Sequence, residues 1–204
     1  MVQAVVLGLA GVFDTIAALR AAEVAAFAEW VVARGGRRAV VLDAIAAGGP
    51  GWRSAALRAA GLRPQSPLAC EATLHAGTAL PHSDQDAALA WIEPIRGSLP
   101  IALLESGPLA RLDAWSDALG LGGVAGTHLW TASLGRDAAP PRPLAFRWLA
   151  KRLKLPAHAC LYVAGRPELA HAAQAAGWQH VLLRQPLDPG FDWRAVVRGD
   201  WRGR

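Results

Sequence analysis

The stretch 161–178, LYVAGRPELAHAAQAAGW, decides the fold class of this chain. Together with Cys160, its first residues form a short apolar run, which is typical of a strand buried on both faces. Turn-forming residues follow, and the Ala-rich segment after them predicts a helix that ends at Gly177. Residues 179–184 (QHVLLR) predict a further strand, which completes a strand–helix–strand unit. We therefore expect parallel strands joined by a right-handed crossover.

The same alternation extends backwards through the second half of the chain. The apolar run at 100–105 predicts a second buried strand, and residues 124–131 (VAGTHLWT) predict a third strand. The segments 106–119 and 142–153 have helix-like spacing, and Pro108 suits the first turn of the earlier helix. The second half is therefore predicted to be a series of parallel strand–helix units.

The first half is organised differently. One apolar run within residues 3–9 predicts a buried strand, and helical segments with Gly- and Pro-rich breaks then continue to about residue 95. One strand, a helical insertion and a run of strand–helix units predict an α/β fold with a Rossmann-like parallel sheet core. We assign residues 1–15 and 96–204 to this core, and residues 16–95 to an inserted helical cap.

Composition limits the classes of function. The chain has 204 residues, of which 53% are hydrophobic and 18% charged, so we expect a globular protein. Its net charge of +5 comes from scattered basic residues, and the cluster Lys151, Arg152 and Lys154 is interpreted as solvated surface. We therefore expect neither nucleic acid nor a membrane as partner. Cys70 and Cys160 lack CxxC partners, and no signal peptide is evident, so a cytoplasmic protein with reduced thiols is predicted.

Four segments resemble, in order, the motifs of the haloacid dehalogenase (HAD)-like hydrolase superfamily. They are VVLGLAGVFDT (5–15), ALLESGP (102–108), PPRPLAF (140–146) and the opening stretch at 161–178. The nearest branch is that of the capped sugar-phosphate phosphatases and phosphoglucomutase-like proteins. The resemblance covers nearly the whole chain, and it implies a Rossmann-like core with a helical cap inserted after the first strand.

The resemblance also implies a catalytic set that this chain lacks. The family uses an aspartate nucleophile, an aspartate acid/base, a lysine that neutralises phosphoryl charge, and acids that help to hold Mg²⁺. The matching positions carry no acid, base or ligand group. They are Gly8 (nucleophile), Ala10 (acid/base), Pro140 (lysine), and Ala164, Gly165 and Leu169 (metal ligands).

We interpret the chain as a pseudoenzyme, a catalytically inactive HAD-like protein that acts as a binding or regulatory module. Its expected partner is another protein, a second copy of the chain or a small anionic ligand, and no cofactor or Mg²⁺ is expected. The alternative is a HAD-like hydrolase of altered chemistry that acts on a small, phosphorylated metabolite. In that case residues of the cap would supply a new acid or base, with Asp43, His75, His82 and Asp84 as candidates.

Two further features remain open between a functional and a structural role. Ser106 and Gly107 lie where a strand meets a helix N-terminus, which favours either an anion site or a local helix cap. Trp193 and Trp201 alternate with arginines in the tail, which predicts packing against the chain's own core or against a partner. Four other tryptophans occupy apolar helix positions and are expected in the core: Trp30, Trp91, Trp115 and Trp148.

Overall fold

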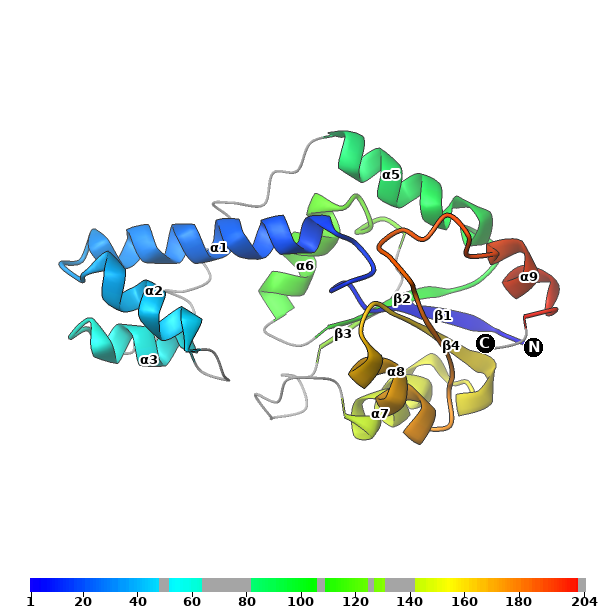
Figure 1. The fold of residues 1–204 in the computed structure, drawn as a ribbon. Coiled ribbons are helices and arrows are strands. Elements are labelled where there is room, and N and C mark those ends of the chain that lie inside the picture. The colour runs from blue at the N-terminus through cyan, green and yellow to red at the C-terminus, as the bar shows by residue number, and fades with distance from the viewer. Residues whose placement is uncertain (48–51, 64–81, 106–108, 125–126, 131–141, 202–204) are drawn as a thin grey trace. The chain divides into compact units, whose positions relative to one another are not determined.

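A parallel five-stranded sheet forms the centre of the computed structural model, in the order β3-β2-β1-β4-β5 (Figure 1). The structure describes residues 1–47, 52–63, 82–105, 109–124, 127–130 and 142–201. The strands are β1 (Ala4–Leu7), β2 (Ile101–Glu105), β3 (Thr127–Trp130), β4 (Cys160–Ala164) and β5 (Gln179–Leu182). All pairs are parallel, so the predicted Rossmann-like α/β class is confirmed.

The central position of β1 explains its composition. It pairs with β2 on one side and with β4 on the other, and Val6 lies in register with both Ala102 and Tyr162. Every residue of β1, β2 and β4 is buried. Strands covered on both faces need apolar side chains throughout, which is why these segments read as unbroken apolar runs.

Helices connect the strands and cover the sheet. The helical elements are α1 (Thr15–Val32), α2 (Arg38–Ala46), α3 (Trp52–Ala59), α5 (His82–Ile92), η2 (Glu93–Ile95), α6 (Leu109–Ala118), α7 (Pro143–Leu153), η4 (Ala157–Ala159), α8 (Pro167–Ala175) and α9 (Trp193–Arg198). Helices α7 and α8 lie on one face of the sheet, and α5 and α9 lie on the other (Figure 1). No helix in the described part of the chain is both long enough and apolar enough to cross a membrane.

The chain divides into two compact units. The core unit comprises Met1–Ile16 and Leu80–Arg204, and the inserted unit comprises Ala17–Ala79. The inserted unit has its own apolar cluster, in which Phe27 and Val41 are fully buried. The predicted cap extends to residue 95, whereas residues 80–95 group with the core unit in this division.

An aromatic group ties residues 80–95 and the C-terminal tail to the core unit. Trp91 makes an edge contact with Phe13 and another with Trp193, whose ring centroid lies 4.9 Å away. The Trp91 indole donates a hydrogen bond to the carbonyl of Asp188. The tail therefore packs against its own domain, in a short helix that the sequence analysis did not predict.

The tryptophans expected in the core have different environments. Trp115 is buried, and Trp30 and Trp91 are partly exposed. Trp148 is 45% exposed, so its predicted core position was wrong. The reason is geometric, because α7 turns Phe146 and Leu149 towards the sheet, and Trp148 then points away from it. Among the cysteines, Cys160 is a buried free thiol, and Cys70 lies outside the described residues.

We predict that Trp193→Ala lowers the free energy of unfolding by about 3–5 kcal/mol, the usual cost of emptying a buried aromatic site. Trp193 is only 3% exposed, so its removal leaves a cavity beside Trp91. Trp148→Ala is the matched control and should lower the free energy of unfolding by clearly less, because the side chain is 45% exposed. Urea unfolding measures both values. An equal loss of unfolding free energy in the two variants would contradict the packing of Trp193 against the core unit.

Candidate functional site

The carboxyl ends of β1, β2 and β4 meet at one edge of the sheet. Parallel α/β sheets bind their ligands at this edge, so it is the candidate functional site. Gly8 follows β1, Glu105 ends β2, and Ala164 ends β4. We refer to this region as the carboxyl edge.

A buried phenol fills the space beside Gly8. Tyr162 is fully buried on β4, and a Cβ atom placed on Gly8 would overlap the Tyr162 hydroxyl and lie 3.1 Å from its Cζ. Real Cβ atoms do not make contacts of this kind unless a neighbour moves. Position 8, where the family resemblance places the nucleophile, therefore accommodates glycine but no larger residue in this arrangement.

A second close approach joins the loops that follow β1 and β4. A Cβ atom placed on Gly165 would overlap the backbone of Gly11. Gly11 itself has φ +81, a conformation that favours glycine, and its own added Cβ would lie 2.8 Å from the Gly165 carbonyl oxygen. The two loops thus cross backbone against backbone, and neither glycine has room for a side chain.

The other predicted site residues contribute no polar group to the described structure. Ala10, Ala164 and Leu169 are buried and apolar, and Leu169 belongs to the core cluster under α7 and α8. Asp43 is exposed on α2, and Asp84 is partly buried on α5. Four predicted residues lie outside the described residues: His75, Ser106, Gly107 and Pro140. His82 begins α5, and the structure describes only its backbone.

The sequence analysis missed one polar residue at this edge. Glu105 is only 2% exposed, and its Oε2 accepts a 3.0 Å hydrogen bond from the backbone N–H of Ala10, which is 95 residues away. The bond fixes the end of β2 to the loop after β1. The available signal was an acid as the last residue of an otherwise apolar strand, PIALLE (100–105), because such an acid lies at the edge where ligands bind.

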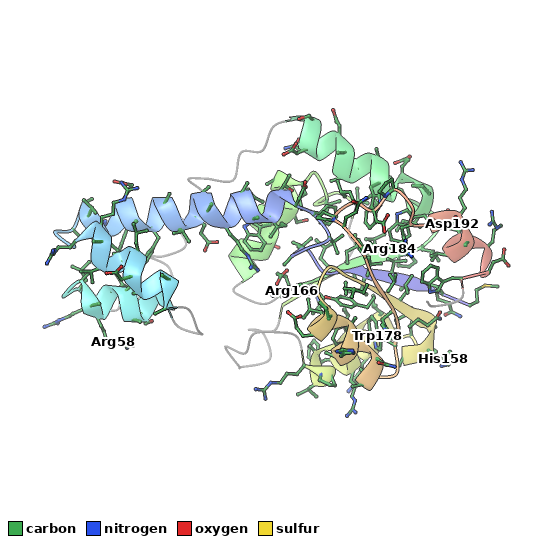
Figure 2. All side chains as sticks on the ribbon, in the orientation of Figure 1. Arg58, His158, Arg166, Trp178, Arg184 and Asp192 are labelled. Carbon is green, nitrogen blue, oxygen red and sulfur yellow. The ribbon has the colours of Figure 1, made fainter. Side chains whose placement is uncertain are left out.

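Charged groups surround the Tyr162 phenol. Burial raises the pKa of Tyr162 well above its ordinary range, and the negative charge of Glu105 raises it further. Arg166, which is labelled in Figure 2, acts in the opposite direction. Its Nε lies 3.4 Å from Oε1 of Glu168. The phenol is therefore neutral over the whole physiological range. Its hydroxyl has no hydrogen-bond partner in the structure.

No metal site can be drawn from the residues that the structure describes. Among them, no group of three or more His, Cys, Asp or Glu side chains could hold an ion. At the carboxyl edge the side chains at positions 164, 165 and 169 contain no oxygen. These residues do not fit Mg²⁺, because this hard cation binds to oxygen ligands.

We predict that Gly8→Ala lowers the free energy of unfolding by about 1–3 kcal/mol, the typical cost of overpacking a core. Tyr162→Phe removes the atom nearest to the added methyl group, so Gly8→Ala should cost about 1 kcal/mol less in that background. Tyr162→Phe alone should be neutral or stabilising, because it deletes a buried hydroxyl without a partner. Urea unfolding of the four proteins measures the coupling. Additive effects would show that the phenol does not restrict position 8.

Comparisons with known proteins agree with the topology. No family model and no curated protein matches the chain. Its structure is similar to CbbY from Rhodobacter sphaeroides in complex with phosphate, with a TM-score of 0.62 and 16% identity over 95% of this chain and 91% of that one. It is also similar to the L-2-haloacid dehalogenase from Xanthobacter autotrophicus with chloropropionic acid covalently bound. That comparison has a TM-score of 0.56 and 18% identity, over 97% of this chain and 82% of that one.

A third solved structure leads to the same result. A haloacid dehalogenase-like family hydrolase from Xanthomonas campestris has a TM-score of 0.56 and 13% identity, over 97% of this chain and 91% of that one. At such identities the likeness concerns the fold and not the chemistry. The chain therefore has the haloacid dehalogenase-like fold, as the four sequence segments led us to expect.

Proposed function

We propose that this chain is a catalytically inactive HAD-like protein that acts as a binding or regulatory module. One observation carries the proposal, namely that the Tyr162 hydroxyl occupies the space in which a side chain at position 8 would begin. Covalent catalysis requires a nucleophile within reach of the substrate. With glycine at position 8 and a neutral phenol beside it, an aspartyl-phosphate cannot form there.

The absence of metal chemistry is part of the same proposal. Ala164 and Leu169 are buried and apolar, and Gly165 has no room for a carboxylate. A phosphatase of this fold needs the cation to offset the charge of the phosphoryl oxygens. We therefore propose that the chain binds no catalytic Mg²⁺. Its partner would be another protein, a second copy of the chain or a small anion near Ser106 and Gly107, which lie outside the described residues.

We expect no Mg²⁺-dependent turnover by the purified chain with p-nitrophenyl phosphate or a panel of sugar phosphates. The restored variant Gly8→Asp with Ala10→Asp should also be inactive. It should unfold at a lower temperature, because the new side chain at position 8 would overlap Tyr162. A Mg²⁺-dependent phosphatase of known activity, assayed in parallel, is the positive control. Turnover by the wild-type chain that requires Mg²⁺ would overturn the proposal.

A second candidate function is a HAD-like hydrolase of altered chemistry that acts on a small, phosphorylated metabolite. The observation that favours it is Glu105, a buried carboxylate at the edge where ligands bind such sheets. A carboxyl group in that position can exchange a proton with a bound substrate. The phenol of Tyr162 lies close enough for its pKa to respond to the charge of Glu105.

Glu105→Gln distinguishes this candidate from the first. If Glu105 acts as an acid or base, the variant should lose about 100-fold or more of a metal-independent hydrolase activity, the usual share of general acid–base catalysis. Glu168→Gln, which changes an exposed carboxyl group paired with Arg166, is the matched control. Hydrolysis by the wild type that survives in Glu105→Gln would remove Glu105 from the mechanism.

A further inference from the structure

Helix α7 exposes two large apolar side chains on its outer face. Its inner face is buried in the core cluster through Phe146 and Leu149. On the opposite face Leu144 is 54% exposed and Trp148 is 45% exposed. They are four residues apart, so they are neighbours on one side of the helix. Neither side chain belongs to the core cluster.

Cations surround this apolar pair. All five basic residues of the helix and its two flanking positions are exposed, and in the described part of the chain none of them forms an ion pair. They are Arg142, Arg147, Lys151, Arg152 and Lys154. The sequence from 138 to 167 contains no Asp or Glu. We call Leu144, Trp148 and these five cations the α7 surface.

The neighbouring elements do not neutralise this charge. The acids nearest along the chain are Asp137, which lies outside the described residues, and Glu168 at the start of α8, which is paired with Arg166. Helix α8 also contributes His171, and η4 contributes His158, and neither residue is acidic. Among the described residues, no acid on these neighbouring elements pairs with a cation of the α7 surface. A cluster of unpaired cations attracts anionic partners and repels cationic ones.

Five cations beside two apolar side chains fit some classes of partner better than others. A second copy of this chain that docked through the same face would bring two sets of cations together, so a symmetric self-contact is unfavourable. A specific protein interface buries about 800 Å² on each partner, with aromatic and apolar side chains at its centre. Leu144 and Trp148 alone are too few to form such a centre. Phosphates of a nucleic acid would engage the cations but would leave Leu144 exposed to water.

A bilayer surface can contact both the cations and the apolar side chains of the α7 surface. Tryptophan concentrates at the membrane–water interface, and a leucine beside it can enter the upper acyl region. Lysine and arginine near an anionic leaflet each strengthen binding by about fivefold. We propose that the α7 surface docks this domain onto a bilayer rich in anionic phospholipid.

This docking does not require a spanning helix, because α7 would lie on the membrane with its inner face still packed on the sheet. It also does not depend on the catalytic state of the carboxyl edge. From the sequence alone, Lys151, Arg152 and Lys154 were interpreted as solvated charge, Trp148 was placed in the core, and no membrane partner was expected. The exposure of Trp148 changes that interpretation, since it adds an apolar anchor to the basic cluster.

Co-sedimentation of the full chain with vesicles tests the proposal. We expect binding to phosphatidylcholine vesicles that contain about 30% phosphatidylserine, and at least tenfold weaker binding to phosphatidylcholine alone. Raising the salt from about 0.1 M to about 1 M shortens the screening length from about 10 Å to about 3 Å, so it should release most of the bound protein.

Variants assign the binding to the α7 surface. Lys151→Glu with Arg152→Glu should weaken binding to the anionic vesicles at least tenfold. Arg58→Glu with Arg63→Glu is the control, because both arginines are exposed in the inserted unit and the change of net charge is the same. Trp148→Asp should abolish binding, and Trp148→Phe should retain it. Circular dichroism and thermal unfolding verify that each variant is folded.

Three results would overturn the proposal. The first is equal binding to the two kinds of vesicle, and the second is an equal loss of binding in the Arg58/Arg63 control. The third is the absence of vesicle binding while a labelled single-stranded oligonucleotide or polyglutamate binds through Lys151 and Arg152. That result would assign the α7 surface to a nucleic acid or to an acidic protein instead.

Discussion

The contact between the Tyr162 hydroxyl and the backbone at Gly8 is the constraint on which the carboxyl edge depends. It occurs at the centre of the sheet, because β4 lies beside β1 and Tyr162 is in register with Val6. A side chain at position 8 would have to displace a fully buried ring that packs against Phe146 with centroids 4.8 Å apart. Packed cores resist such displacement, so one aromatic residue on β4 determines what the neighbouring strand can present.

The carboxylate at the carboxyl edge comes from a different strand than the resemblance implies. The family places its carboxylates after β1 and β4, where this chain has Gly8, Ala10 and Gly165. Here the buried carboxylate comes from β2, as Glu105, and it accepts the N–H of Ala10. A buried charge is tolerated when hydrogen bonds replace its lost hydration. The bond therefore stabilises Glu105 and at the same time holds the loop after β1 in place.

The sequence predicted β1, β2 and β4 well because burial on both faces leaves an apolar run in each of them. All five predicted strands are present, and β5 ends at Leu182, two residues before the predicted end. The helix α9 was missed, since its six residues are too few to establish a periodicity, and Trp193 is fixed by contacts with Trp91 that are remote in sequence. Trp148 was correctly predicted to lie on a helix. Its exposure was not predicted, because it depends on which face of α7 packs against the sheet.

The candidate site was less predictable than the fold for a physical reason. Sequence comparison identified which residue types are missing, but the steric exclusion at Gly8 depends on a ring from a strand more than 150 positions away. Such long-range pairs become visible only after the strands are ordered. The apolar and glycine residues at the carboxyl edge now have a packing role, which explains their presence without any ligand. Leu144 and Trp148 have no such role, because they are exposed on a stable helix. Exposed apolar side chains that lie next to one another, unlike single ones, mark surfaces that contact a partner.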